Sequence, residues 1–231
     1  MKVLVTGGTG LVGSHTAAAL LRDGHEVRLL VRRPERIART FRPFATEPTE
    51  VMVGDATDRE AVHRAIDGCD AVLHAAATVA LKRSDAERVN RLNTQAAETV
   101  LELASAARLD PIISVSSVSV FDLDESVVTV NSPLSSVAHG YSRAKCDAER
   151  FARGMQVAGA PVTITYPGGV FGPIVPGATL PAMHQAAISW IRDRWVLPSG
   201  LNLVDVRDVA AAHVAMMRPG RGPRRVMLGG H

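Results

Sequence analysis

The chain has no long hydrophobic run, few cysteines and few aromatic residues. Its most apolar windows are short, and none approaches the roughly 20 residues that a membrane-spanning helix needs. Residues Met1–Val5 pass directly into a strand pattern and leave no room for a signal peptide. The two cysteines, Cys69 and Cys146, are too few for a disulfide framework and lack metal-ligand spacing. These absences argue against a membrane protein and against a disulfide-rich secreted domain, and we expect a cytoplasmic protein.

Charge and aromatic content argue against a nucleic-acid-binding protein. Aromatic residues make up 4% of the chain, and the formal net charge is only +3 although the sequence pI is about 9.2. Basic residues are spread along the chain and are not clustered with aromatic residues. Lysine is rare, with residues only at positions 2, 82 and 145, so arginine is the usual cation of this chain.

Short β-rich runs alternate with longer stretches of helical periodicity. The expected strands are Val3–Thr6, Glu26–Val31, Val51–Val53, Ala71–His74, Ile112–Ser116 and Val162–Tyr166. The expected helices are Leu11–Arg22, Asp58–Ile66, Ala86–Ala107 and Ser142–Ala158. Continuous apolar strands that alternate with helices are typical of a parallel sheet covered on both faces. The sequence therefore predicts an α/β fold, a doubly wound and mostly parallel Rossmann sheet, over residues 1–166.

The composition changes after Tyr166. Prolines and glycines alternate over residues 167–181, which indicates a segment rich in loops. A helix over Ala178–Arg194, another over Val206–Met217 and a last strand over Arg225–Leu228 are expected to follow. Residues 167–231 are thus predicted to form a small substrate-binding segment whose last elements return to the core.

The stretch TGGTGLVGSH places four glycines between the first strand and the first helix. The spacing fits Gly-x-Gly-x-x-Gly from Gly8, or Gly-x-x-Gly-x-x-Gly from Gly7, and both readings have the context of a dinucleotide-binding fingerprint. The early glycines permit a tight turn and close approach to a pyrophosphate, and Gly13 permits close packing of helix on strand. The helix N-terminus offers its free N–H groups to the anion. The alternative is a tight turn without a ligand.

The residues after the second strand bear on the choice between NAD and NADP. An acid there accepts hydrogen bonds from the ribose hydroxyls, whereas arginine accommodates a 2′-phosphate. Here Arg32, Arg33 and Pro34 follow the strand, Glu26 comes too early, and Glu35 lies beyond the proline. We therefore expect NADP(H) to be preferred, with NAD(H) as the alternative. A solvated loop in an arginine-rich chain would have the same sequence.

Tyr141 and Lys145 form a Tyr-x-x-x-Lys pattern, in which both side chains share one helix face. A phenol has an ordinary pKa of about 10, and a nearby ammonium group favours the phenolate and brings that pKa toward neutrality. The pattern is common by chance, but the strand upstream ends in Ser116 and Ser117, and carboxyl ends of parallel strands bind ligands. Ser117 is placed to hold a substrate oxygen that Tyr141 protonates or deprotonates. The alternative is that both serines only satisfy backbone groups.

In this order, these motifs resemble the short-chain dehydrogenases/reductases. The resemblance is to their extended branch, also called the NAD-dependent epimerase/dehydratase family. The matching segments are Thr6–Gly13, His74–Ala77, Ser116–Ser117, Tyr141–Lys145, Gly54–Asp58, Asn90–Thr94, Pro167–Pro173 and Val204–Ala210. They cover essentially the whole chain, and Asn93 stands where the family has glycine.

The resemblance implies an oxidoreductase that moves a hydride between a nicotinamide and a carbon bearing oxygen. Ser117, Tyr141 and Lys145 would be catalytic, Asp55 would hold the adenine, and Arg32 would take the 2′-phosphate. The residues expected to bind the cofactor are Gly7, Gly10, Leu11, Val12, Gly13, Arg32, Arg33, Asp55, Ala56, Ala75, Ala76, Tyr141, Lys145, Pro167 and Val170. No metal ligand is expected.

Departures from the family pattern narrow the reaction. Dehydratases of the family carry Asp-Glu directly after the catalytic hydroxyl residue, whereas Val118 and Ser119 follow Ser117 here. The arginines after the second strand favour a reductase of ketones or aldehydes, similar to the dihydroflavonol-reductase-like and steroid-dehydrogenase-like branches. A nucleotide-sugar epimerase and a non-catalytic NAD(P)-binding sensor or interaction protein stay open. Tyr166 stands where many members have arginine, which argues against a phosphate-bearing substrate group.

A small-molecule carbonyl or alcohol is the expected partner, bound by a C-terminal part shorter than in most members of the family. The resemblance also permits a homodimer through Ala86–Ala107 and Ser142–Ala158. The apolar spacing of Val100, Leu101 and Leu103 fits such a face, with packing on the sheet as the alternative.

Three histidines are candidate acid–base groups. His74 is expected to pack or to contact the cofactor, and His139 lies near the substrate in one of the alternatives. His184 falls in the segment where the sequence gives no assignment.

Overall fold

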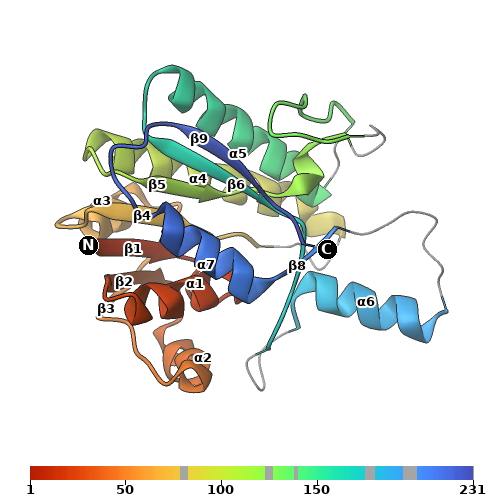
Figure 1. Ribbon diagram of the computed structural model, residues 1–231, viewed down its shortest axis with the longest axis horizontal. Helices are drawn as coiled ribbons and strands as arrows, with labels where there is room; N and C mark the ends of the chain where they lie inside the picture. Colours follow the sequence, from red (N-terminus) through yellow and green to blue (C-terminus); the bar gives the residue numbers. More distant parts are fainter. Residues whose placement is uncertain (79–82, 123–126, 138–139, 175–179, 195–201, 231) are drawn as a thin grey trace.

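The computed structural model describes residues 1–78, 83–122, 127–137, 140–174, 180–194 and 202–230 (Figure 1). Its central sheet has seven strands in the order β3-β2-β1-β4-β5-β6-β9, and all neighbours run parallel. The strands are β1 (Lys2–Thr6), β2 (Glu26–Val31), β3 (Glu50–Val53), β4 (Ala71–His74), β5 (Ile112–Val115), β6 (Val162–Pro167) and β9 (Arg224–Leu228). The chain runs outward from β1 to β3 and then restarts at β4 on the other side of β1. This order confirms the doubly wound Rossmann sheet.

Helices cover both faces of the sheet, as Figure 1 shows. They are α1 (Leu11–Arg22), α2 (Ile37–Phe41), α3 (Arg59–Ile66), α4 (Ala86–Ala106), α5 (Gly140–Val157), α6 (Ala182–Arg192) and α7 (Val206–Met216). Short 3-10 helices are η1 (Pro34–Arg36), η2 (Arg42–Phe44), η3 (Arg83–Asp85) and η4 (Val118–Val120). Helices α1 and α7 pack on each other on one side, and α4 packs on α3 and α5 on the other.

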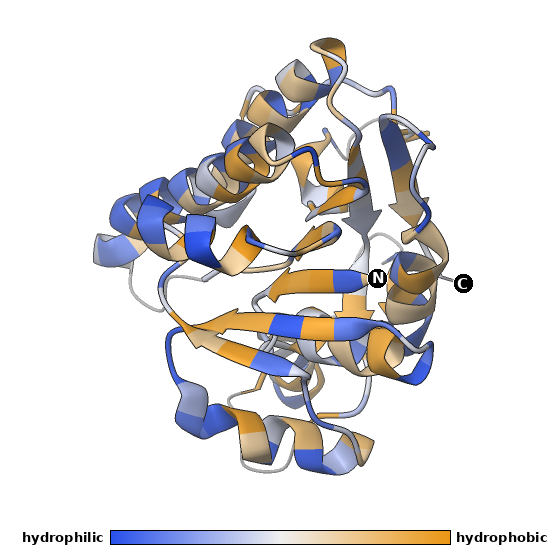
Figure 2. Ribbon diagram, turned by 90° about the vertical axis from the view of Figure 1, so that its left-hand side faces the viewer, coloured by the Kyte–Doolittle hydropathy of each residue, from blue (hydrophilic) through white to orange (hydrophobic). Residues whose placement is uncertain are grey.

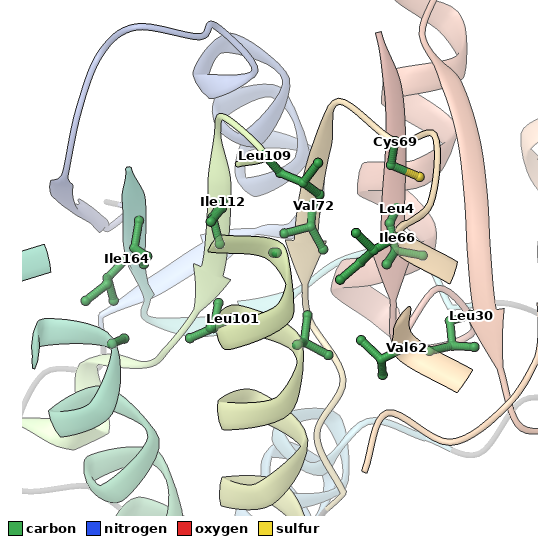
Figure 3. Close-up of a cluster of buried hydrophobic side chains, with 14 of the residues drawn as sticks. Leu4, Leu30, Val62, Ile66, Cys69, Val72, Leu101, Leu109, Ile112 and Ile164 are labelled. Atoms are coloured by element: carbon green, nitrogen blue, oxygen red, sulfur yellow. The ribbon is translucent and has the colours of Figure 1, made fainter. Parts of the chain in front are cut away.

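The alternation of side chains along β1 feeds two hydrophobic cores. Val3 and Val5 pack in the cluster that includes α1 and α7, whereas Leu4 packs in the cluster that includes α3, α4 and α5 (Figure 3). All three side chains are fully buried, and the central strands are largely orange, the hydrophobic colour, in Figure 2. Burying a side chain of this size contributes roughly 1.5–3 kcal/mol. A strand buried on both faces explains why the predicted strands are continuous apolar runs.

Local capping agrees with the sequence. The side chain of Asp58 accepts hydrogen bonds from the amides of Glu60 and Ala61 at 2.9 and 3.3 Å, so it caps α3. Gly24, directly after the C-cap of α1, has φ +85°, a conformation that favours glycine.

The segment after β6 contains secondary structure that the sequence analysis did not predict. Strands β7 (Gly169–Phe171) and β8 (Leu203–Asp205) form a separate parallel pair. A Cβ on Gly168 would lie 2.5 Å from the backbone oxygen of Asn202, so the two backbones approach closely. Glycine has low strand propensity, and a strand built on such an approach therefore has no periodic signal. Helix α6 spans Ala182–Arg192 within the longer range predicted for it, whose first residues lie outside the described ones.

Two residues chosen for a dimer face belong to the core. Val100 and Leu101 on α4 are fully buried against the sheet, so the packing alternative is correct for them. Leu103 is partly buried and packs against the same core.

Cys69 and Cys146 are both buried and free. Across the ranges that the structure describes, no helix combines the length and hydrophobicity that crossing a bilayer requires.

Candidate active site

The turn between β1 and α1 can be built only with glycine at two positions. Gly7 has φ +75°, and a Cβ there would lie 2.6 Å from the backbone of Ala75 and Ala76, which follow β4. A Cβ on Gly13 would lie 2.2 Å from the carbonyl oxygen of Gly7. The turn is therefore pressed between its own helix and the neighbouring strand end, at the point where the strand order reverses.

The N-terminus of α1 is open to an anion. Gly10 is the N-cap and has no side chain, so no side-chain group caps the first amides of the helix. The amides of Leu11, Val12 and Gly13 have no acceptor within the helix, because the first intrahelical bond runs from Ser14 to Gly10. Such amides, together with the helix dipole, form an anion site. The geometry fits the pyrophosphate of a dinucleotide.

An open cleft of about 440 Å³ extends from this turn. Its walls come from the ends of β1 and β2, the segment after β3, the segment after β4, and α4. The residues that line it and that the sequence analysis assigns to the cofactor are Gly7, Gly10, Arg32, Asp55, Ala56, Ala75 and Ala76. Tyr141 and Lys145 do not line this cleft, nor do Pro167 at the end of β6 and Val170 on β7.

The structure changes the set of arginines. Arg32 lines the cleft and so does Arg36, the last residue of η1, whereas Arg33 does not. Arg88 on α4 lines the cleft as well. The sequence analysis missed Arg36 and Arg88. The short helix η1 starts at Pro34, and its turn directs which arginines face the cleft.

Arg32 and Asp55, assigned to different parts of the cofactor, lie next to each other. Arg32 Nη1 is 3.8 Å from Asp55 Oδ2, and the two side chains are 65% and 44% exposed. The other carboxylate oxygen of Asp55 accepts the amide and the hydroxyl of Thr57, both at 2.9 Å. Asp55 is thus oriented by its own loop. An exposed pair at this distance contributes about 0–1 kcal/mol, so a ligand can readily replace it.

Tyr141 and Lys145 lie on successive turns of α5, as predicted. Lys145 Nζ is 5.9 Å from the centre of the Tyr141 ring and donates a 2.6 Å hydrogen bond to the carbonyl of Val115, the last residue of β5. Ser117 follows two residues later as the N-cap of η4, where its hydroxyl oxygen accepts the amide of Ser119 at 3.2 Å. The structure therefore brings Tyr141, Lys145 and the carboxyl end of β5 together, with Ser117 directly beyond that end.

A second, small cavity of about 20 Å³ lies under Lys145, large enough for one water molecule. Its polar lining includes His74, Asn93, Ser116 and Glu149 besides Lys145. Asn93, Ala76 and Ala77 line both this cavity and the large cleft, so the two spaces adjoin.

His74 is a buried, neutral packing group. Its Nδ1 is 2.9 Å from the hydroxyl oxygen of Thr6. Burial, and then the charge of Lys145, lower the pKa of His74 to about 3. His74 is therefore uncharged near neutral pH, in agreement with the packing interpretation.

His184 and His139 have different outcomes. Nε2 of His184 is 3.2 Å from the Gly172 carbonyl oxygen, and the ring centre of His184 lies 4.8 Å from that of Phe171. His184 therefore holds α6 against the segment after β7. His139 lies outside the described residues.

Asn93 clamps the segment that follows β4. Its side-chain oxygen accepts the amide of Thr78 at 2.9 Å, and its side-chain nitrogen donates to the carbonyl of Thr78 at 2.8 Å. Thr78 and Asn93 both line the large cleft. The sequence offered one signal for this residue, because Asn93 stands where the family has glycine.

Glu149 is a buried carboxylate that the sequence analysis missed. Its two oxygens accept hydrogen bonds from the Ser116 hydroxyl at 2.6 Å, from Arg153 Nε at 2.9 Å, and from the Tyr166 hydroxyl. Burial, and then the charge of Glu149, raise the pKa of Tyr166 far above its ordinary value. The available signal was the spacing, since Glu149 follows Lys145 by one helical turn.

Tyr166 therefore requires a correction. The sequence interpretation used it as a clue to the substrate side, but its side chain is fully buried and its hydroxyl faces α5. The identity of this residue carries no information about a phosphate on the substrate.

The chain is similar to known proteins over nearly its whole length. Residues 3–229 match the model of the NAD-dependent epimerase/dehydratase family. A protein of Synechocystis sp. named as a dihydroflavonol 4-reductase is 31% identical over 228 residues, which cover 94% of this chain and 63% of that protein. A 4-hydroxy-2-methyl-3-oxo-4-farnesyl-3,4-dihydroquinoline-1-oxide ketoreductase of Stigmatella aurantiaca is 32% identical over 203 residues, which cover 85% of this chain and 58% of that protein. The chain thus spans about three fifths of the length of these two relatives.

The fold is also found in solved structures. A UDP-glucose-4-epimerase from Stenotrophomonas maltophila, solved with bound NAD and formylated UDP-arabinopyranose, superposes with a TM-score of 0.83 over 99% of this chain and 78% of that chain. Its identity to this chain is 21%, so this likeness concerns the fold alone. The match to the family model over residues 3–229 decides the assignment: the chain belongs to the NAD-dependent epimerase/dehydratase family.

Proposed function

We propose that the protein is an NADP(H)-dependent oxidoreductase that interconverts a carbonyl and an alcohol on a small molecule through Ser117, Tyr141 and Lys145. One observation carries the proposal. The Tyr141–Lys145 pair is fixed to the end of β5 by the 2.6 Å bond from Lys145 to Val115, and the cavity under Lys145 adjoins the open cleft. This arrangement supports a proton donor beside a dinucleotide site at the carboxyl edge of the sheet, where parallel sheets bind ligands.

The glycine turn and the arginines support binding of NADP(H). The uncapped start of α1 would hold the pyrophosphate, and Gly7 leaves room for it. Arg32 and Arg36 after β2, with Arg88 on α4, would surround the 2′-phosphate with positive charge. A doubly charged phosphate attracts Arg32 more strongly than Asp55 does across 3.8 Å. NADH has no such phosphate and gains nothing from exchanging the partner of Arg32.

The protein's own residues would move the proton and orient the substrate. The bound nicotinamide supplies the hydride in reduction and accepts it in oxidation. Tyr141 gives its phenolic proton to the substrate oxygen as the alcohol forms, and takes it back in the reverse direction. The ammonium group of Lys145, held by Val115, stabilises the phenolate that Tyr141 becomes. The hydroxyl of Ser117 hydrogen-bonds the same substrate oxygen and fixes its orientation.

Two measurements test the proposal. Fluorescence titration is expected to give an NADPH dissociation constant at least tenfold below that of NADH. A panel of ketones and aldehydes is then expected to show oxidation of NADPH. Tyr141→Phe is expected to lower kcat roughly 10²–10⁴-fold, because the phenylalanine cannot donate the proton, and to leave NADPH binding unchanged. Tighter binding of NADH than of NADPH contradicts the cofactor assignment. NADPH binding without turnover of any carbonyl contradicts the reaction, and interconversion of nucleotide-sugar epimers would identify an epimerase instead.

A further inference from the structure

One face of α5 binds two consecutive residues at the end of β5. Lys145 donates to the carbonyl of Val115 at 2.6 Å, and Glu149, one turn later, accepts the hydroxyl of Ser116 at 2.6 Å. Ser117 comes next along the chain. Lys145 and Glu149, on successive turns of α5, thus hydrogen-bond to the end of β5. Ser117, the residue assigned to the substrate oxygen, follows directly after it.

The carboxylate of Glu149 is itself held in place by neighbouring residues. Its side chain is fully buried, and burying a carboxylate is costly unless hydrogen bonds and an opposite charge compensate it. Arg153 supplies the charge from the next turn of α5, with Nε at 2.9 Å, and Tyr166 supplies a hydroxyl from β6. Burial by itself lowers the pKa of Arg153, but its bonds to Tyr166 and Glu149 more than offset this and raise it. The guanidinium therefore keeps its charge.

Arg153 and Tyr166, which hold Glu149, also contact each other and the segment after β5. Arg153 Nη2 donates to the Tyr166 hydroxyl at 3.3 Å, and the guanidinium carbon lies 5.8 Å from the centre of the Phe121 ring. The Phe121 ring centre is 4.9 Å from that of Tyr166. Helix α5, strand β6 and the segment after β5 are thus joined through one carboxylate. Little freedom is left for Glu149 to move relative to Tyr166 and Arg153.

Glu149 also lies close to the reacting groups without being one of them. It lines the cavity of about 20 Å³ that Lys145 and His74 line. Tyr141, Lys145 and Glu149 follow each other at four-residue intervals on α5, so they share one helix face. A small shift of the strand end relative to this face changes the distance between the Ser117 hydroxyl and the Tyr141 phenol.

We propose that Glu149 is a positioning residue: held by Arg153 and Tyr166, its carboxylate anchors Ser116 and thereby sets the place of Ser117 opposite Tyr141. This role rests on the proposed function, because only that function gives Ser117 and Tyr141 a common substrate oxygen. In this role Ser116 affects the reaction only by positioning Ser117 and does not itself contact the substrate. Misplacement by about 1 Å at a distance from the chemistry can lower a rate roughly 10²-fold.

The experiment compares the full-length wild type with Ser116→Ala, Ser116→Thr, Glu149→Gln and Asp147→Asn. Asp147 is the matched control, because it is an exposed acid on the same helix, paired with Arg150 at 2.6 Å. Four quantities are measured: kcat, KM, the NADPH dissociation constant, and amide hydrogen exchange over residues 112–121 and 162–167. Ser116→Ala keeps the buried Glu149–Arg153–Tyr166 contacts, so it answers the question even where Glu149→Gln fails to fold.

Ser116→Ala is expected to lower kcat 10- to 100-fold while the NADPH dissociation constant changes less than twofold. Exchange is expected to accelerate at least tenfold over residues 116–121 and to stay unchanged over 162–167. Ser116→Thr, which keeps a hydroxyl, is expected to recover kcat to within threefold, and Asp147→Asn to match the wild type. A merely structural Glu149 would not separate kcat from cofactor binding, and would not be rescued by threonine.

The proposal is overturned if Ser116→Ala keeps kcat within threefold of the wild type. It is equally overturned if exchange over residues 116–121 does not change. A wild-type protein that binds NADPH but turns over no carbonyl or alcohol contradicts the proposed function instead. The exchange data alone then decide whether Glu149 anchors the strand end.

Discussion

Two pairs of arginine and carboxylate stand on opposite sides of the candidate site, and they differ in nearly every physical respect. Arg32 and Asp55 are 3.8 Å apart with side chains 65% and 44% exposed. Arg153 and Glu149 are 2.9 Å apart, with side chains 23% and 0% exposed. Water and salt screen the first pair, which makes it weak, whereas burial commits the second to the fold. The first can give up its partner to a ligand, and the second cannot.

Under the proposed function, the β2–β3 side is a recognition side, which binds the cofactor phosphate, and the β5–β6 side is a reaction side. On the β2–β3 side, charge lies on exposed arginines that a phosphate can recruit. On the β5–β6 side, the charge of Glu149 is buried, paired with Arg153 and bonded to the hydroxyl of Ser116 at the end of β5. A reaction that transfers a proton and a hydride needs fixed geometry, whereas exchange of a cofactor needs groups that can change partners. Substitutions should therefore affect stability and rate on one side, and cofactor affinity on the other.

Breaking the buried pair is expected to have the largest effect on stability. Arg153→Met removes the positive partner of a buried carboxylate, and we expect the free energy of unfolding to fall by about 3 kcal/mol. Arg150→Met, one turn away in an exposed pair, is the matched control and is expected to stay within about 0.5 kcal/mol of the wild type. Urea unfolding followed by circular dichroism measures both values. Equal losses in the two variants would remove the distinction between the pairs.

A buried neutral histidine, on the other face of the sheet from Glu149, makes stability depend on pH. His213 on α7 lies between the hydroxyls of Thr16 and Thr165, each 3.1 Å from a ring nitrogen. Burial lowers the pKa of His213 to about 4, so protonation below the ordinary pKa of 6.5 favours the unfolded chain. Stability from this residue is complete above pH 6.5 and is lost as the pH falls toward 4. Between pH 7.5 and 5.0 we expect His213 to account for a loss of about 2 kcal/mol.

Urea unfolding at both pH values checks this expectation. His213→Gln cannot take up the proton, so its stability should change with pH by about 2 kcal/mol less than that of the wild type. The control is His63→Gln on the exposed surface of α3, which should keep the wild-type dependence. The same dependence in wild type and His213→Gln would show that other groups govern the acid response.

The parts of the molecule that the sequence predicted well are those fixed by local backbone geometry. Gly7 and Gly13 are required by clashes inside one turn and with one neighbouring strand, so their spacing alone points to the turn. The Tyr141–Lys145 pair depends only on helical periodicity. The parallel strands are apolar on both faces, and their alternation with helices predicts that they run parallel.

The parts that were missed depend on contacts between elements distant in sequence. Glu149 is informative only once β5, β6 and α5 are packed together, because Ser116 and Tyr166 lie on different elements. Whether Arg33 or Arg36 faces the cleft depends on the direction of the chain after Pro34, which composition does not encode. Strands β7 and β8 have no periodic signal because glycine backbone forms part of the contact.

Reversing the charge of Arg32 tests whether the exposed pair recognises the phosphate of the cofactor. Arg32→Asp is expected to weaken NADPH binding at least tenfold and to leave NADH binding within about threefold, because only NADPH carries the 2′-phosphate. Arg33→Asp makes the same charge change outside the cleft and should weaken NADPH less than threefold. Fluorescence titration measures all four dissociation constants. An equal effect at Arg33 would support the arrangement expected from the sequence alone, in which both arginines bind the cofactor.

Thermal unfolding of Arg32→Asp completes this test. Arg32 contributes only an exposed, weak pair, so its loss should leave the melting temperature close to that of the wild type. A marked fall would mean that the recognition side also carries stability, and the two sides would no longer differ in kind.

The smallest expected effect is at Asn93, which borders both sides. Its two hydrogen bonds to Thr78, at 2.9 and 2.8 Å, hold the segment after β4 that lines the cleft. Asn93→Ala keeps the helix but releases the clamp, and NADPH binding should weaken about three- to tenfold, which corresponds to one or two modest hydrogen bonds. Asn90→Ala makes the same change one turn earlier on α4 and should leave binding unaltered. If both variants bind NADPH like the wild type, the segment after β4 keeps its shape without the two hydrogen bonds from Asn93. The residues that fix the geometry of the site would then lie only on β5 and α5.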